Sequence, residues 1–149
     1  MTTQTFSISF SSDEEDFISR ACPECRTRFK AKVTDGEINI SSCPFCQHGG
    51  DRWETPEQLE YGKAFAAKQV LQPEFDKLDR AFKSLGRSGG MVKVTGQMPD
   101  LKVPSKPVER TEDMAQRTTS ACCNATVRHD EDVHPRFCIA CGKAAAQIP

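Results

Sequence analysis

The stretch that decides the fold is Cys22-Pro-Glu-Cys25 together with Cys43-Pro-Phe-Cys46, two Cys-x-x-Cys pairs separated by 17 residues. Each pair directs both of its sulfurs to one point, and the intervening residues predict strand, turn and strand, which brings the two points together. Four thiolates gathered in this way form a tetrahedral metal site, with Zn–S distances of roughly 2.3 Å. Because protein fills every position, we expect a structural zinc that activates no water; iron and a redox dithiol or disulfide are the alternatives.

A second group of cysteines, Cys122-Cys123 and Cys138-Ile-Ala-Cys141-Gly142, has 14 residues between its two halves, enough for a hairpin. Adjacent strand residues point to opposite faces, so Cys122 and Cys123 can both bind one metal only if the backbone turns sharply there. We therefore expect two Zn²⁺ per chain, the second held by all four of these cysteines. The alternatives for the second group are a set in which His129 or His134 replaces one cysteine, and no metal at all.

Composition gives a reason to expect bound metal. The chain has 149 residues and a mass of 16.5 kDa, and only 28 residues, about 19%, are Val, Ile, Leu or Phe. So few strongly apolar side chains leave folding dependent on something besides a hydrophobic core. The first residues lack a secretory signal and no run of 18 apolar residues occurs, so we expect a cytoplasmic protein in which thiols stay reduced.

The segment after Cys25 contains four cations in alternation, at Arg26, Arg28, Lys30 and Lys32. Because strand side chains alternate between faces, these four give one wholly basic face, while Ile38 and Ile40 in a return strand cover the other. The basic face solvates an exposed strand, binds nucleic-acid phosphates with help from Phe45 and Trp53, or meets an acidic partner. The net charge of −1 excludes a strong global attraction to nucleic acid.

A helix is predicted from Thr55, where Thr55, Pro56 and Gln58 form an N-terminal cap pattern. We expect it to reach about Leu71 and to break or kink at Gln72–Pro73. An apolar stripe follows and is ended by Gly86; it is either the contact between helix and ribbon or a dimer seam, and it consists of Phe75, Leu78, Phe82 and Leu85.

The remaining segments complete the expected organisation. Phe6, Ile8 and Phe10 alternate with serines and predict a short strand, and the acidic run that follows, to Asp16, is interpreted as solvated. The expected segments are an N-terminal strand and zinc ribbon (1–50), a helical segment (51–86), a flexible basic linker (87–111) and a second ribbon-like module (112–149). The linker carries Gly, Pro, a possible short strand at Met91–Thr95, and the cations Lys93, Lys102 and Lys106.

The two Cys-Pro-x-Cys turns resemble the knuckles of the zinc-ribbon superfamily over about residues 17 to 48. The second cluster resembles a degenerate ribbon, since it keeps the Cys-x-x-Cys-Gly ending and departs at Cys122-Cys123. The resemblance implies a small α+β metal-stabilised protein, with two zinc-ribbon β-hairpin modules joined by a helical segment and a flexible linker. It implies a fold rather than one activity, because zinc ribbons occur in transcription factors, polymerase subunits, ribosomal proteins, primases and docking modules.

Catalytic motifs are absent from the sequence: it has no nucleophile elbow, no phosphate-binding loop and no His-Glu-x-x-His. We therefore expect no enzyme activity and no catalytic residues. The expected function is a non-catalytic zinc-binding adapter or accessory factor that docks onto a protein or nucleoprotein complex. The alternative is direct nucleic-acid binding, associated with transcription or replication, through the four cations of the basic segment.

Overall fold

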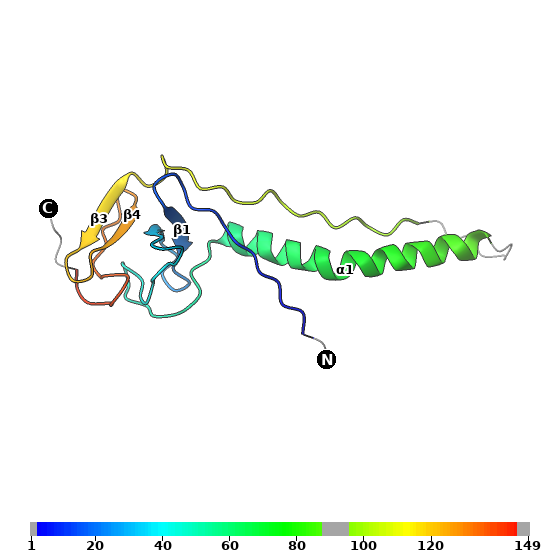
Figure 1. Cartoon of the computed structure of the whole chain (residues 1–149), viewed down its shortest axis with the longest axis horizontal. Coiled ribbons are helices and arrows are strands. Elements are labelled where there is room, and N and C mark those ends of the chain that lie inside the picture. The colour runs from blue at the N-terminus through cyan, green and yellow to red at the C-terminus, as the bar shows by residue number, and fades with distance from the viewer. Residues whose placement is uncertain (1–2, 88–95, 146–149) are drawn as a thin grey trace. The chain divides into compact units, whose positions relative to one another are not determined.

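The computed structural model describes residues 3–87 and 96–145, in which the chain forms two compact units. The sheet unit comprises Ser9–Gln58 and Pro107–Pro149, and the helical unit comprises Met1–Ile8 and Leu59–Lys106. The elements are β1 (Phe17–Ala21), β2 (Arg28–Lys32), α1 (Pro56–Arg87), β3 (Gln116–Ser120) and β4 (Ala125–His129), and Figure 1 labels all of them except β2. The strand considered at Met91–Thr95 and the cation Lys93 lie outside the described residues.

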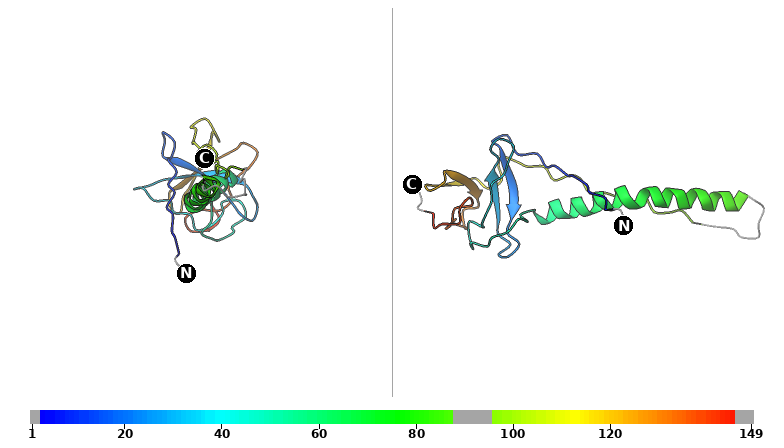
Figure 2. Two further views of the ribbon diagram at one scale, coloured as in Figure 1. Left: turned by 90° about the vertical axis from the view of Figure 1, so that its right-hand side faces the viewer. Right: turned by 60° about the horizontal axis from the view of Figure 1, so that its bottom comes forward.

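One antiparallel sheet contains all four strands, in the order β1-β2-β4-β3. The pairing of β2 with β4, Lys30 with Arg128 and Ala31 with Val127, joins the strands of the first cysteine region to those of the second. In Figure 2 the blue N-terminal strands accordingly lie beside the yellow and orange C-terminal strands. Both cysteine regions therefore share one compact unit, which differs from the expected pair of tethered modules.

The core of the sheet unit is small and includes two of the cysteines, Cys22 and Cys43. Its buried cluster draws on both cysteine regions and consists of Cys22, Phe29, Ala31, Cys43, Trp53, Val127 and Ile139. Ile38 and Ile40 pack against this cluster as expected, but they lie in irregular chain rather than in a return strand. The chain after β2 does turn back, with an antiparallel bridge between Thr34 and Glu37, but no return strand follows, and β2 pairs with β4 instead.

The N-terminal alternation at Phe6, Ile8 and Phe10 forms no strand in the described chain, and the first strand begins at Phe17. A period-two pattern produces a strand only where a neighbouring strand supplies hydrogen bonds, and the edge next to β1 is occupied by other contacts. The prediction of an N-terminal strand at Phe6 was therefore wrong.

The start of α1 follows the predicted cap. The amide of Gln58 donates to Oγ1 of Thr55 at 3.3 Å, and the amide of Thr55 donates to Oε1 of Gln58 at 3.0 Å, a reciprocal capping box. The predicted break at Gln72–Pro73 was wrong, because α1 continues through Pro73 to Arg87. Proline removes one amide donor, but side-chain contacts span the turn around it, with Nε2 of Gln72 3.1 Å from Oδ1 of Asp76 and Nζ of Lys77 2.6 Å from Oε1 of Glu74.

The apolar stripe of α1 is exposed rather than packed in a core. Leu78 and Phe82 are each about two-fifths exposed and Leu85 is 62% exposed, so the stripe is not buried within the helical unit, and its expected contact with the ribbon stays a prediction. The segment after Gly96 runs beside the helix within the helical unit, where the amide of Leu101 donates to Oε1 of Gln72 at 2.9 Å. In the described residues, α1 lacks the apolar stretch that crossing a lipid bilayer requires.

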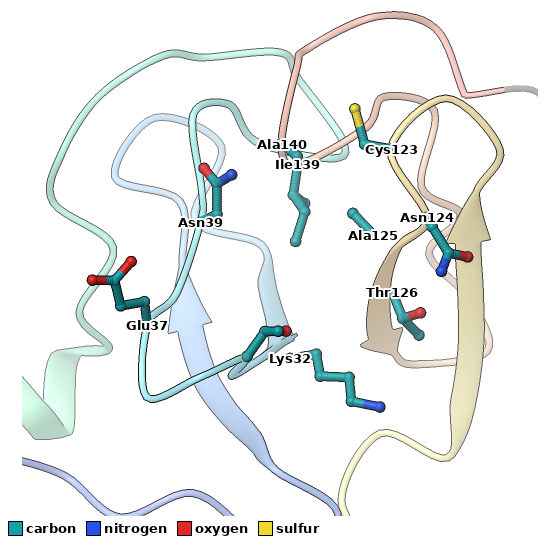
Figure 3. Close-up of a pocket in the computed structure, with 10 residues that line it drawn as sticks. Lys32, Glu37, Asn39, Cys123, Asn124, Ala125, Thr126, Ile139 and Ala140 are labelled. Atoms are coloured by element: carbon teal, nitrogen blue, oxygen red, sulfur yellow. The ribbon is translucent and has the colours of Figure 1, made fainter.

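A pocket of about 260 Å³ lies in the sheet unit, between the segment after β2 and the start of β4 (Figure 3). Both cysteine regions contribute to it, and its lining combines amides, hydroxyls, one ammonium and one carboxylate over a small apolar floor. The residues are Lys32, Thr34, Glu37, Asn39, Cys123, Asn124, Ala125, Thr126, Ile139 and Ala140. The pocket is a further consequence of joining the two regions in one sheet.

Candidate metal centres

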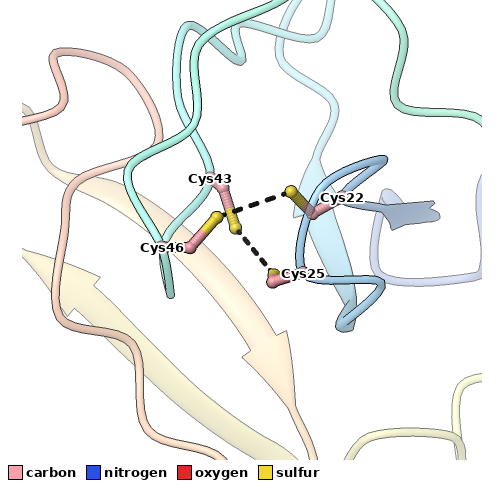
Figure 4. A group of neighbouring side chains, drawn as sticks. All are labelled: Cys22, Cys25, Cys43 and Cys46. Carbon is pink, nitrogen blue, oxygen red and sulfur yellow. Dashed lines mark hydrogen bonds between the residues drawn. The ribbon is translucent and has the colours of Figure 1, made fainter.

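The first group of thiols has the geometry of a tetrahedral metal site. One sulfur from each of Cys22, Cys25, Cys43 and Cys46 lies within 4.8 Å of all the others. The Sγ atoms of Cys22 and Cys46 are 3.6 Å apart and those of Cys25 and Cys43 are 3.7 Å apart (Figure 4). A tetrahedron with metal–sulfur bonds of roughly 2.3 Å has edges of about 3.8 Å, so the group fits a bound ion.

The second group is equally compact, and the structure explains its adjacent cysteines. Sulfurs of Cys122, Cys123, Cys138 and Cys141 also lie within 4.8 Å of one another, with Cys122 and Cys141 3.5 Å apart. Ser120 pairs with Ala125, so the two adjacent cysteines occupy the tight turn between β3 and β4. Asn124 closes that turn at a φ of 51°. The backbone therefore turns sharply where the sequence required it to.

The histidine alternatives are not favoured in the described chain, where neither histidine joins the group of sulfurs. His129 is buried and both its ring nitrogens have partners: Nδ1 lies 2.8 Å from the carbonyl of Asp130 and Nε2 lies 2.9 Å from Oγ1 of Thr118. A carbonyl only accepts, so Nδ1 carries a proton. His134 packs edge-on against His129.

Three of the four cysteine turns share one hydrogen-bond pattern. In each, the amide of the first cysteine donates to the carbonyl five residues later, and the amide four residues later donates back to that cysteine's carbonyl. The residue at that fourth position has a positive φ in all three: 60° at Arg26, 65° at Gln47 and 72° at Gly142. The repeated pattern defines three equivalent knuckles, and the Cys122–Cys123 turn is the exception.

Hydrogen bonding gives each group one thiol that ionises readily. Burial, the largest influence, acts to raise the pKa of Cys25, but the hydroxyl and amide of Thr27 outweigh it and lower that pKa to about 7. Burial likewise opposes the amides of Ala140 and Cys141, which lower the pKa of Cys138 to about 7. Burial raises the pKa of Cys43, so metal binding must displace protons.

The two groups are bonded to each other through their knuckles. The amides of Ser41 and Ser42 donate to the carbonyl of Ile139 at 2.7 and 3.2 Å. In the opposite direction, the amides of Arg136 and Phe137 donate to the carbonyl of Pro44 at 2.7 and 3.0 Å. The knuckle that supplies two ligands to the first group is thus held in place by the knuckle that supplies two ligands to the second.

The four predicted cations do not form one exposed face. The side chain of Lys30 is completely buried, with Nζ 3.2 Å from Oδ2 of Asp13 and 3.5 Å from Oε2 of Glu109. Arg28 is half exposed and pairs with Glu57 at 2.7 Å. Arg26 and Lys32 are exposed. The prediction of a wholly basic, solvent-facing strand was therefore wrong at Lys30.

Sequence reasoning missed the buried ionic cluster around Lys30. The acidic run was interpreted as solvated, yet Asp13 is buried, and its Oδ1 accepts the amides of Glu15 and Phe17 at 3.0 and 2.9 Å. Arg128 reaches Oδ2 of Asp13 at 3.5 Å and Oε2 of Glu15 at 3.1 Å. No local signal marks such a cluster, because Asp13, Lys30 and Arg128 come from three separate segments.

The chain matches no protein-family model, no curated protein and no solved structure. The two groups of four cysteines are compatible with zinc-ribbon-like modules, and each could hold one metal ion.

Proposed function

We propose that the chain is a non-catalytic zinc-binding adapter that docks onto a protein or a protein assembly. The observation that carries the proposal is that both candidate centres consist of four protein thiolates. Such a site leaves the metal no open position for water or substrate, so its role is to hold the fold. A sheet unit with so small an apolar core gains most from structural metal, because binding free energy becomes folding free energy.

Zinc is the proposed metal for both sites. Thiolate ligands in a tetrahedral arrangement suit zinc, and they also suit iron. Elemental analysis of the purified protein distinguishes the two: we expect two zinc ions per chain and no absorbance of the kind that iron–thiolate centres give. One ion per chain would restrict the proposal to one site.

Charge favours a protein partner over nucleic acid. The sheet unit carries eleven Lys and Arg against sixteen Asp and Glu, a net charge of −5, whereas the helical unit carries nine against five, a net charge of +4. Each zinc ion bound by four thiolates adds a charge of −2, so the loaded sheet unit has a charge of about −9. A surface of that sign repels phosphates and attracts basic partners.

Direct nucleic-acid binding, the alternative, loses support from the side chains that suggested it. Lys30 is buried and Arg28 is paired with Glu57, so two of the four cations are already engaged. Trp53 is buried, which removes its ring as a stacking surface, and Phe45 is partly buried and packs edge-on against Phe29. Arg26 and Lys32 remain exposed, too few for strong phosphate binding.

The test compares protein capture with nucleic-acid binding. Immobilised zinc-loaded protein is expected to retain specific proteins from a lysate of its native cells, and protein stripped of metal is expected to lose them. Labelled 20-nucleotide single- and double-stranded DNA and RNA are expected to bind no tighter than roughly 10⁻⁵ M at physiological salt. Tight, salt-sensitive binding to any of these oligonucleotides, weakened in Arg26→Ser and Lys32→Ser, would replace the adapter proposal with the alternative.

A further inference from the structure

The two edge strands of the sheet, β1 and β3, differ in whether their outward backbone groups are hydrogen-bonded. At the β1 edge such groups already have partners. The outward amide of Phe17 donates to Oδ1 of Asp13, that of Ser19 to Oε1 of Glu109 and that of Ala21 to the carbonyl of Trp53, each at 2.9 Å. The outward carbonyl of Ser19 accepts from Nε2 of Gln58 at 3.2 Å. No strand can add here without displacing these contacts.

The β3 edge is open. In an antiparallel sheet, the backbone amide and carbonyl of successive residues point alternately to the two neighbouring strands. The registers of the four strands therefore fix which residues of β3 direct these groups away from the sheet, and they are Arg117 and Thr119. Within residues 3–87 and 96–145, no hydrogen bond is made to the backbone amides or carbonyls of these two residues. The edge thus offers two amides and two carbonyls in the spacing that an added strand requires.

The open strand is already held in the extended conformation by its side chains. Thr118 bonds to the ring of His129 at 2.9 Å, Thr119 to the hydroxyl of Thr126 at 3.0 Å, and Arg117 pairs with Glu15. The addition of a peptide to this edge therefore requires little further ordering of β3 itself.

One end of the open edge is strongly acidic. Gln116 begins β3 and pairs with His129, so the chain just before β3 and the turn just after β4 flank the same end. Their five carboxylates are exposed, and in the described chain none forms an ion pair; they are Glu112, Asp113, Asp130, Glu131 and Asp132. A strand that carries cations at this end gains favourable charge contacts in addition to backbone hydrogen bonds.

We propose that the edge of β3 is the docking surface of this adapter, and that its occupant is an extended basic segment of a partner protein, which adds as a fifth strand with its cations beside the acidic end. The inference rests on the proposed function and names its class of partner. Edge-to-edge pairing with the β3 of a second copy is less favourable, because two sheet units repel: each has a charge of −5 before metal binds and a more negative one when loaded.

Two variants of the same residue test the edge. Thr119→Pro removes an outward amide without breaking the pairing with β4, and Thr119→Ala is the matched control, because both variants lose the hydroxyl bond to Thr126. The probe is a labelled, terminally blocked (Lys-Val)₄ peptide, compared with (Glu-Val)₄ and with (Lys-Val)₄ methylated on alternate backbone nitrogens. Binding is followed by fluorescence anisotropy, and by amide NMR shifts and hydrogen exchange in the zinc-loaded full chain.

We expect (Lys-Val)₄ to bind wild type and Thr119→Ala, and to bind Thr119→Pro at least tenfold more weakly. Exchange of the Arg117 and Thr119 amides in wild type is expected to slow on binding. Charge removal by Asp130→Asn, Glu131→Gln and Asp132→Asn together is expected to weaken binding at least threefold. Neither control peptide is expected to bind.

The inference is overturned if (Lys-Val)₄ fails to bind wild type, if it binds Thr119→Pro and Thr119→Ala equally, or if the methylated peptide binds as well. It is also overturned if ultracentrifugation shows a wild-type dimer that Thr119→Pro abolishes, since the occupant is then a second copy. If Thr119→Pro and Thr119→Ala capture proteins equally well and only when metal is bound, the β3 edge is not the docking surface, but the proposed adapter function is retained. Failure of wild type to retain any protein overturns the function, and this inference with it.

Discussion

The hydroxyl of Ser42 donates to the backbone carbonyl of Cys138 at 3.1 Å, so a residue adjacent to one ligand of the first centre is bonded to a ligand of the second. Nearby, Nε2 of Gln47 donates to the carbonyl of Gly142 at 2.7 Å. Together with the backbone bonds between the same knuckles, these contacts make the position of each knuckle depend on the other. The two candidate centres are therefore joined in one hydrogen-bonded structure.

This coupling predicts that damage to one centre weakens the other. Cys141→Ser removes a ligand of the second centre only, yet we expect less than one tightly bound metal per chain, because the knuckle that supports Cys43 and Cys46 loosens with it. Metal content by elemental analysis checks this, with Lys143→Ala as the control. A Cys141→Ser protein that keeps one metal with wild-type affinity and thermal stability would show that the centres are independent.

The single tryptophan of the chain reports on the first centre. Trp53 is buried, its ring lies 6.3 Å from both Phe29 and His48, and its carbonyl holds the amide of Ala21 beside Cys22. Removal of metal is expected to expose this ring, because binding and folding are linked. We expect a red shift of the fluorescence maximum after complete metal removal, reversed when Zn²⁺ is added back. An unchanged spectrum after confirmed metal removal contradicts the prediction.

The parts of this fold that follow from local chemistry were predictable from the sequence. The Cys-x-x-Cys knuckles and the cap formed by Thr55 and Gln58 depend on residues within five positions of one another, and both are present. The turn at Cys122–Cys123 was predictable as a requirement, since both sulfurs can reach one metal only if the chain reverses there.

The long-range parts were not predictable. The pairing of β2 with β4 joins residues about a hundred positions apart, and the sequence of the short polar strand β4 does not indicate which strand it pairs with. The alternating cations typical of a solvated strand concealed Lys30, whose burial depends on carboxylates at Asp13 and Glu109. A buried lysine is recognisable only when its partners are known.

Removal of one partner of the Lys30–Asp13 ion pair is expected to destabilise the protein, and simultaneous replacement of both partners is expected to destabilise it less than two independent effects would. Lys30→Met leaves Asp13 buried with one ion-pair partner fewer, and we expect it to lower the free energy of unfolding by about 3 kcal/mol. Asp13→Asn keeps an oxygen for the amides of Glu15 and Phe17 but leaves Lys30 less compensated. In denaturant titrations of the zinc-loaded protein, we expect the two single substitutions to be non-additive. The loss of unfolding free energy in the double variant should be smaller, by at least about 1 kcal/mol, than the sum of the losses in the two single variants.

The same pair predicts how stability depends on pH. Burial acts to raise the pKa of Asp13, but the amides of Phe17 and Glu15 and the ammonium of Lys30 outweigh it, so the pKa lies below its usual range. A lowered pKa in the folded state gives stabilisation that is complete above the unfolded pKa and is lost only as the pH falls through the folded value. The stability gap between wild type and Asp13→Asn should therefore be constant from pH 5 to pH 8. A gap that narrows between pH 7 and pH 5 would mean that Asp13 titrates higher.

Equivalent positions in two knuckles predict opposite effects of exchanging glycine and a larger residue. Arg26 has a φ of 60°, a left-handed conformation that costs a non-glycine residue on the order of 1 kcal/mol. The hydrogen bond from its backbone amide to the carbonyl of Cys22 is retained in Arg26→Gly. This variant is expected to raise the free energy of unfolding by about 0.5–1 kcal/mol. Gly142 has a φ of 72°, and an added Cβ there would lie 3.0 Å from Oγ of Ser42.

Gly142→Ala is therefore expected to lower the free energy of unfolding by more than 1 kcal/mol, since it adds backbone strain and crowds the hydroxyl that bonds Cys138. Because Ser42 precedes Cys43, the same change should also weaken metal binding at the first centre, which the fluorescence of Trp53 reports. Arg26→Ala is the control for loss of the Arg26 side chain alone, and it should leave stability within about 0.5 kcal/mol of wild type. Equal stability of Arg26→Gly and Arg26→Ala would argue that the first knuckle carries no backbone strain at this position.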